Sequence, residues 1–312
     1  MGVIYIVSVE EGAGKTSLCV GLAKNILDAG KNAGYLKPHT AGIEGSDSDI
    51  IFMKHVLGLD DVVNAPDIIR GRDEVFVEAM VGQTEQDPLS QSTYGAAREM
   101  QAKVIAVEPY SETDSGYADV YKGFGENLLG VVINKVPDSQ TARVKEAAAG
   151  RLEAAGIKLL GVIPENRTLL AVTVGELAEK LSGTIINNQE KASDLVENFM
   201  LGAMIVDSGL DYFGRMSNKA AIVRQDRPDM QLAALETSTS CLVLGGSAQP
   251  PLYNVQEKAS YRGIPVITTD TAVSDIADAI DDILMTGRMN QEKKLSRLTE
   301  MVKQNLDIAA LV

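Results

Sequence analysis

Residues 8–17, with the sequence SVEEGAGKTS, constrain the fold of this chain more than any other stretch. A run of apolar and β-branched residues at 3–9 comes just before, and an apolar stripe with helical spacing follows from Lys15. A strand, a glycine-containing loop and a helix start, in this order, are typical of a phosphate-binding loop. The backbone N–H groups of such a loop and the positive end of its helix favour anionic oxygens.

We therefore predict a nucleotide phosphate site in this loop. Gly12 and Gly14 let the backbone approach a phosphate without a Cβ clash. Lys15 would reach the β- and γ-phosphates of ATP, and the Thr16 hydroxyl would be a ligand of Mg²⁺. The alternative, a strand–helix turn that only needs two glycines, does not explain why Lys15 and Thr16 follow Gly14 directly. The predicted nucleotide contacts in the loop are Glu11, Gly12, Ala13, Gly14, Lys15, Thr16 and Ser17.

Apolar strands alternate with helical segments after the loop. The expected strands are residues 33–37, 74–78, 103–107, 128–134 and 159–163, and the expected helices are 49–57, 93–100 and 139–155. Strands that are apolar along their whole length indicate parallel βαβ units covered on both faces. The predicted fold class is α/β, with a parallel P-loop sheet flanked by helices.

The second half of the chain also reads as α/β, and the length of 312 residues is enough for two domains. The expected strands are residues 184–187, 220–223, 241–245 and 265–268, and the expected helices are 193–200, 230–237, 256–261 and 273–284. An apolar stripe at Leu295, Leu298, Val302 and Leu306 predicts a last helix that packs on its own domain or on a partner subunit. The predicted domains are residues 1–170 and 171–290, followed by a C-terminal helix at 291–312.

Several polar residues fall at or just after expected strand ends, where parallel sheets bind their ligands. They are Lys15, Lys37, Asp49, Glu78 and Asn134. Taken singly, each has an ordinary alternative: a solvated loop lysine for Lys37, a helix start for Asp49, and a turn residue for Asn134. Glu78 is harder to explain in this way, because apolar positions precede it. Their convergence is what predicts a site.

Composition excludes some functions. The formal net charge of −14 disfavours nucleic acid and anionic membranes as partners, and aromatic residues make up only 4%. No apolar run is long enough to span a bilayer, and no signal peptide is seen at the N-terminus. The two cysteines cannot form a disulfide framework, so we expect a cytoplasmic protein.

The first half resembles the dethiobiotin synthetase-like P-loop family. The matching pieces are the phosphate loop, the stretch YLKPHTAG at residues 35–42, the Asp49 region, the strand-end Glu78, and the VIN that ends at Asn134. The resemblance implies that Lys15 and Lys37 contact phosphate or carbamate oxygens as catalytic residues. It also implies that Asp49 and Glu78 hold Mg²⁺ together with Thr16, and that Asn134 reads adenine.

The second half resembles a DRTGG domain, from VGELAEKLSGTII at residue 174 onward. The two domains in this order are similar to the N-terminal, non-catalytic region of long-form phosphotransacetylases. The match has departures. Ser8 and Ala79 stand where the P-loop family has glycine, and residues 226–229 read DRPD in place of the name-giving motif. The acetyltransferase domain that would follow is not part of this sequence.

Two classes of function remain open. The first is a regulatory or sensory module that binds Mg·ATP, hydrolyses it slowly at most, and senses a small ligand in its second domain, where Arg224 and residues 226–229 are the best candidates. The second is an ATP-dependent ligase or phosphotransferase that acts on a small carboxylate or amine, with Lys37 holding the substrate. The absent acetyltransferase part favours the module, and Lys37 favours the ligase. We expect a homo-oligomer in either case.

Overall fold

The computed structural model describes residues 2–37, 48–59, 69–80, 89–112, 116–202, 209–285 and 292–311. The chain forms two compact units, one of residues 1–166 with 289–312 and one of residues 167–288. Residues 38–42 of the YLKPHTAG stretch lie outside the described residues. Each unit has its own sheet and its own core, so each is described by itself.

The first unit is built on a parallel sheet. Its strands are β1 (Gly2–Val7), β2 (Ala33–Leu36), β3 (Glu74–Glu78), β4 (Lys103–Pro109), β5 (Leu128–Val136) and β6 (Leu159–Pro164). Within the described residues their order is β2-β3-β1-β4-β5-β6, and every neighbouring pair is parallel. The predicted α/β fold with a parallel P-loop sheet is confirmed.

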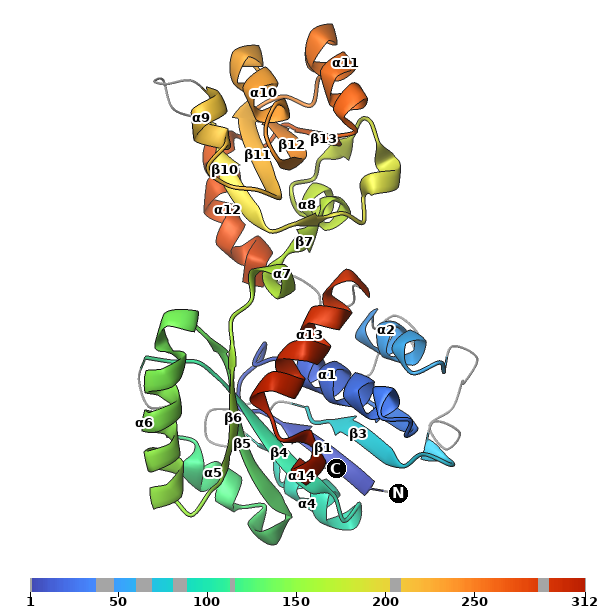
Figure 1. Ribbon diagram of the computed structural model, residues 1–312, viewed down its shortest axis with the longest axis vertical. Helices are drawn as coiled ribbons and strands as arrows, with labels where there is room; N and C mark the ends of the chain where they lie inside the picture. The colour runs from blue at the N-terminus through green and yellow to red at the C-terminus, as the bar shows by residue number, and fades with distance from the viewer. Residues whose placement is uncertain are drawn as a thin grey trace. The chain divides into compact units, whose positions relative to one another are not determined.

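Helices cover both faces of this sheet (Figure 1). On one face lie α1 (Lys15–Asp28) and α13 (Glu292–Asn305), with α14 (Ile308–Leu311) after it. The other helices of the unit are α2 (Ser48–Val56), α4 (Gln91–Glu99), α5 (Ala118–Lys122) and α6 (Thr141–Ala154). Short 3-10 turns, η1 (Gly125–Asn127) and η2 (Asp138–Gln140), flank β5.

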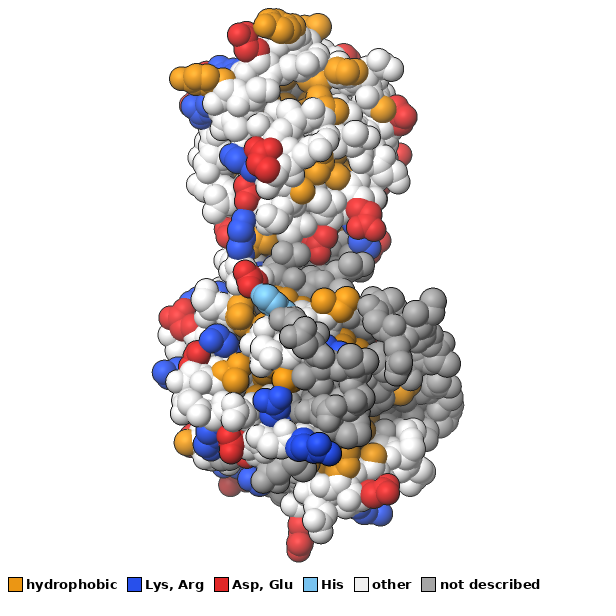
Figure 2. All heavy atoms as spheres, turned by 90° about the vertical axis from the view of Figure 1, so that its right-hand side faces the viewer, with side chains coloured by type: hydrophobic (Ala, Val, Ile, Leu, Met, Phe, Trp, Pro, Cys, Tyr) orange, Lys and Arg blue, Asp and Glu red, His pale blue; other side chains and the backbone are white. Residues whose placement is uncertain are grey.

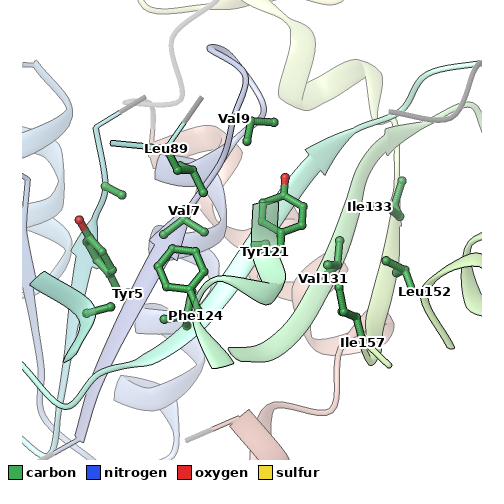
Figure 3. Packing of buried hydrophobic residues seen from close by; sticks show 14 of the residues in the cluster. Tyr5, Val7, Val9, Leu89, Tyr121, Phe124, Val131, Ile133, Leu152 and Ile157 are labelled. Atoms are coloured by element: carbon green, nitrogen blue, oxygen red, sulfur yellow. The ribbon is translucent and has the colours of Figure 1, made fainter. Parts of the chain in front are cut away.

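The face of the sheet towards α4, α5 and α6 has a continuous apolar core (Figure 3). Alternate strand residues point into it because successive side chains of a strand face opposite sides. The fully buried Tyr121 and the nearly buried Phe124 fill its centre. Residues that Figure 3 labels include Tyr5, Val7, Val9, Leu89, Val131, Ile133, Leu152 and Ile157.

The tail helix α13 packs on α1 of the first unit. Leu298, Met301 and Val302 are buried, and the Asn25 side chain of α1 donates a hydrogen bond to the Thr299 carbonyl at 3.0 Å. Close packing is possible because α1 carries Gly21, where an added Cβ would come within 2.5 Å of Val302 Cγ2. The apolar stripe predicted a helix that packs on its own domain or on a partner subunit. The helix packs on the first unit of its own chain.

The second unit contains a mixed sheet. Its strands in order are β10 (Asn198–Leu201), β11 (Lys219–Arg224), β12 (Thr239–Gly245), β13 (Val266–Thr269) and β8 (Thr184–Ile185). Only the β13–β8 pair is antiparallel among the described strands of this sheet. Strands β7 (Val172–Thr173) and β9 (Leu195–Val196) form a separate, small antiparallel sheet.

Helices lie on both faces of the second sheet as well. One apolar cluster joins the sheet to α8 (Val174–Lys180) and α12 (Val273–Met285), and another joins it to α9 (Gly209–Phe213), α10 (Pro228–Leu235) and α11 (Tyr253–Arg262). The unit begins with the short α7 (Arg167–Leu170), and the turn η3 (Gln189–Lys191) precedes β9. Among the described residues, no helix of either unit has the length and apolarity needed to cross a bilayer.

The helix predicted at residues 193–200 is wrong. Strands β9 and β10 occupy this stretch. Its apolar residues fit helical spacing, but β10 pairs with β11 from Asn198 to Leu201. Phe199 and Leu201 then pack on one face of the sheet and Met200 on the other. Tertiary pairing therefore overrides the local pattern.

Candidate functional site

The loop between β1 and α1 has the backbone geometry of an anion cradle. Gly12 and Gly14 adopt positive φ angles of 66° and 97°. A side chain at Gly14 would also collide with Asn134, because an added Cβ would lie 2.2 Å from Asn134 Nδ2. Helix α1 begins at Lys15 without a side-chain cap, so the N–H groups of its first turn are not satisfied by a capping residue. Such N–H groups are the donors that bind phosphates at helix starts.

Asn134 anchors the loop to the end of β5. Its Nδ2 donates a hydrogen bond to the Ala13 carbonyl at 2.8 Å. Ala13 is 1% exposed, whereas Glu11 and Gly12 are exposed at the tip of the loop. The Ser8 hydroxyl, at the entrance where the P-loop family has glycine, donates to the Glu10 carbonyl at 2.9 Å and accepts from the Glu10 N–H. Ser8 therefore stabilises the start of the loop through its two hydrogen bonds with Glu10.

Lys15 is the first residue of α1 and is only 9% exposed. Burial lowers the pKa of Lys15, and the carboxylate of Glu78 acts in the opposite direction. Glu11 also raises the pKa of Lys15, by a smaller effect. A buried ammonium at the start of a helix without a side-chain cap favours an anion there, since charges interact more strongly away from water.

The Thr16 hydroxyl lies between two carboxylates that come from distant parts of the first unit. Thr16 Oγ1 is 3.2 and 3.0 Å from the two oxygens of Glu78, at the end of β3. It is 3.5 Å from Asp49 Oδ2, in the first turn of α2. The structure thus brings together the three residues that were predicted to hold a metal, although 33 and 62 positions separate them from Thr16 in the sequence.

This set of oxygen donors fits Mg²⁺. Magnesium prefers oxygen ligands and is usually held by one or two carboxylates together with substrate phosphates and waters. Among the described residues no group of three or more His, Cys, Asp or Glu side chains could hold a metal ion. Two carboxylates and one hydroxyl among the described residues therefore offer part of the oxygen set that such a cation takes.

Lys37 follows β2 and joins the same group of side chains. Its Nζ is 2.9 Å from Asp49 Oδ2, and both side chains are about one quarter exposed, at 24% and 26%. Ser17 lies in the first turn of α1 and makes no described contact with these residues. The predicted site residues therefore come from the strand ends of the sheet, from the loop and first turn of α1, and, for Asp49, from the first turn of α2.

Sequence reasoning did not single out Tyr35. Its hydroxyl donates a 2.7 Å hydrogen bond to Glu78 Oε2, and its side chain is 4% exposed. Burial raises the pKa of Tyr35 strongly, and the nearby Cys19 and Glu78 raise it further. The hydroxyl therefore stays protonated and acts as a donor. A tyrosine in a strand is common in sequences and does not indicate a site by itself. Its position two residues before Lys37 could have indicated that Tyr35 belongs to the site.

The residues proposed for a second site, at the carboxyl end of β11, form local ion pairs. Arg224 binds Asp226 through two contacts of 2.9 Å, and Arg227 binds Asp229 at 3.0 and 2.8 Å. The buried Gln231 holds the chain there by donating to the carbonyls of Arg224 and Gln225. These contacts explain the turn before α10 without a ligand.

Two protein-family models match separate parts of the chain. Residues 3–70 match an AAA domain, and residues 176–283 match a DRTGG domain. The phosphate acetyltransferase of Haemophilus influenzae is 24% identical in an alignment that covers 78% of this chain and 42% of that protein. The enzyme of Pseudomonas putida is 23% identical in an alignment that covers 100% of this chain and 51% of that protein.

The chain is homologous to the N-terminal part of phosphate acetyltransferases. It combines a P-loop AAA domain with a DRTGG domain, and it spans about half the length of the curated relatives it matches. The resemblance inferred from the motifs is therefore confirmed. The activity of the relatives is a property of much longer proteins.

Solved structures resemble the chain only distantly. The MinD cell division protein of Aquifex aeolicus is 16% identical with a TM-score of 0.37, over 55% of this chain and 84% of that one. The CBS and DRTGG domains of a Clostridium perfringens pyrophosphatase, complexed with diadenosine tetraphosphate, are 19% identical with a TM-score of 0.32, over 46% and 70%. Scores this low carry no argument about function.

Proposed function

We propose that this chain is a Mg²⁺-dependent ATP-binding protein that acts as a regulatory or sensory module. The observation that carries the proposal is the convergence of the P-loop, Lys15, Thr16, Asp49 and Glu78 at one edge of the first sheet. The homology to the N-terminal part of phosphate acetyltransferases supports a regulatory role and not a catalytic one. We propose the functional domains predicted from the sequence, residues 1–170 and 171–290 followed by a C-terminal helix at 291–312; the compact units that support them are residues 1–166 with 289–312 and residues 167–288.

The loop residues 11–17 would bind the phosphates. Their N–H groups and the start of α1 would surround the β- and γ-phosphates, and Lys15 would pair with the phosphate oxygens. The chemistry that Mg²⁺ would supply there is positive charge that neutralises part of the phosphate charge. Thr16, Asp49 and Glu78 would hold it, directly or through water. Asn134 is the residue proposed to contact adenine.

A second candidate is an ATP-dependent ligase or phosphotransferase of the dethiobiotin synthetase type. The observation that favours it is Lys37, whose Nζ lies 2.9 Å from Asp49 Oδ2 and thus beside the proposed metal site. An ammonium there would hold the carboxylate or carbamate of a small substrate and stabilise the charge of phosphoryl transfer. A module that only binds nucleotide does not need it.

Calorimetric titration with ATP in the presence of Mg²⁺ tests the phosphate site. We expect Lys15→Ala to weaken ATP binding at least about a hundredfold, because a buried ammonium–phosphate pair is lost. Lys24→Ala is the matched control: Lys24 lies on the same helix, but its side chain is 34% exposed and is paired with Asp28. Equal ATP affinity in the two variants would remove the phosphate-loop assignment.

ADP production distinguishes the two candidate functions. The module predicts slow hydrolysis that added amines and carboxylic acids do not change. The ligase predicts steady ADP production only when its substrate is added, and loss of this production in Lys37→Ala with ATP binding retained. Rapid hydrolysis by the unmodified protein alone would contradict the module.

We also propose a homo-oligomer and a small-molecule ligand for the second domain near Arg224 and Asp226. Light scattering measures the first. For the second, a shift in the thermal unfolding of the whole chain by a metabolite panel would identify a ligand, and the Arg224→Ala variant would abolish that shift.

A further inference from the structure

Glu78 is a buried carboxylate held by more than one donor. It is 6% exposed, and Thr16 Oγ1 lies within 3.2 Å of both its oxygens. The phenol of Tyr35 donates to Oε2 at 2.7 Å, which makes it the shortest contact that the structure gives this carboxylate among the described residues. Hydrogen bonds to charged groups are the strong ones in proteins. Tyr35 therefore fixes one oxygen of Glu78 while Thr16 contacts both.

The register of the sheet explains why Tyr35 reaches Glu78. Tyr35 of β2 is directly opposite Phe76 of β3, and the two strands are parallel. Glu78 follows Phe76 by two positions, so its side chain points to the same face of the sheet. A tyrosine is long enough to reach such a diagonal neighbour on the next strand. The contact is thus built into the strand pairing and does not depend on a loop.

The two partners have fixed roles in this hydrogen bond. The Tyr35 hydroxyl is the donor, and Glu78 Oε2 accepts its hydrogen bond. The carboxylate is the acceptor, and it cannot turn towards solvent without leaving both the phenol and the threonine. Lys37 follows Tyr35 by two residues. The end of β2 therefore positions both Tyr35 and the lysine that pairs with Asp49.

We infer that Tyr35 is a positioning residue that holds the Glu78 carboxylate in place for the magnesium ion of a bound nucleotide. This inference rests on the proposed function. It assigns Tyr35 to the metal part of the site and not to the phosphate cradle. Loss of the hydroxyl should therefore affect the Mg²⁺-dependent part of ATP binding and leave the Mg²⁺-independent part unchanged.

The test compares ATP affinity with and without Mg²⁺ in the full chain. For Tyr35→Phe we expect the gain in affinity on adding Mg²⁺ to fall by about tenfold or more, as for the loss of one hydrogen bond to a charged group. ATP affinity in the presence of a chelator should match that of the unmodified chain. The phenyl ring of the variant keeps the packing of β2.

Tyr5→Phe is the matched control. Tyr5 is also a buried strand tyrosine of the same sheet, 5% exposed, but it belongs to the core towards α4, α5 and α6 and its hydroxyl bonds Thr93. It should lose some stability and keep the full Mg²⁺-dependent gain. Thermal unfolding of both variants measures the cost of a missing buried hydroxyl, so a general weakening of the sheet would appear in both.

The outcomes are distinct. A reduced gain in Tyr35→Phe alone supports the inference. A full gain in Tyr35→Phe, or an equal loss in Tyr5→Phe, overturns it while the proposed function stands. If the unmodified chain shows no Mg²⁺-dependent gain, the proposed function fails and this inference fails with it.

Discussion

At the scale of residues, the candidate site is built around Glu78, because the hydroxyls of Thr16 and Tyr35 both donate hydrogen bonds to its carboxylate. Lys15 and Thr16 could be predicted because they come next to Gly14 in a strand–loop–helix pattern. Glu78 could be predicted from its place at a strand end, and the structure puts it 3.0 Å from Thr16. Tyr35 could not be predicted, because only the register of β2 on β3 shows that it reaches Glu78.

Lys219 is a second residue whose role appears only in three dimensions. It is the first residue of β11 and is fully buried. Its Nζ donates to the Met216 carbonyl at 3.1 Å, to Thr237 Oγ1 at 2.9 Å and to the Ser238 carbonyl at 2.8 Å. These contacts join two loops at the amino end of the sheet, so we interpret this lysine as structural.

Lys219→Met should lower the free energy of unfolding of the second unit by about 3 kcal/mol, since buried acceptors that lose their donor cost on the order of 1–3 kcal/mol each. Chemical denaturation measures this change. Lys103→Met is the control, because Lys103 also begins a strand but is exposed. Equal stability of the two variants would contradict the structural role.

The same lysine gives a pH dependence. Burial lowers the pKa of Lys219 from the usual 10.5 to about 8. Between these values the folded chain binds fewer protons than the unfolded chain, so this residue makes the free energy of unfolding rise with pH. The rise should disappear in Lys219→Met. A parallel pH dependence in the variant would show that other groups cause it.

At the scale of elements, the periodicity of apolar residues predicted which segments are strands and which are helices, except where pairing with a distant strand determined the structure. The strong apolar runs of β1, β4 and β5 were predictable. The stretch 193–200 was not, because its partner strand β11 lies some twenty residues on. The tail helix α13 was predicted from its apolar stripe. Its packing on α1 was not predicted, because the local sequence does not indicate which surface an apolar helix face covers.

Gly21→Ala tests the packing of α13 on α1. The added methyl group would meet Val302, so we expect the first unit to lose about 1–2 kcal/mol, as overpacking exceeds the gain in helix propensity. Gly150→Ala in α6 is the control, because nothing lies within 4 Å of its added Cβ. There the substitution should stabilise by up to about 1 kcal/mol. Denaturant titration of both variants measures the difference, and stabilisation by Gly21→Ala would contradict the contact.

At the scale of the whole molecule, composition and motif order indicated two α/β parts, and the family matches agree with that order. What the sequence could not indicate is that the last helix returns to the first unit, which thus contains both ends of the chain. The formal net charge is −14, yet charges of both signs are interspersed over the described part of the face in Figure 2. The acidic balance therefore does not form one uniform patch on that face.

The central claim is that Glu78 and its neighbours make ATP binding depend on Mg²⁺. Calorimetric titration of the whole chain with ATP, with Mg²⁺ and with a chelator, tests it most directly in Glu78→Gln and Glu108→Gln. Glu108 is the control, because it is also a buried carboxylate of the same sheet, 3% exposed in β4, but it is held by Arg151 at 2.8 Å. We expect Glu78→Gln to lose the Mg²⁺-dependent gain in ATP affinity and Glu108→Gln to keep it. A full gain in Glu78→Gln would show that this carboxylate does not hold the metal.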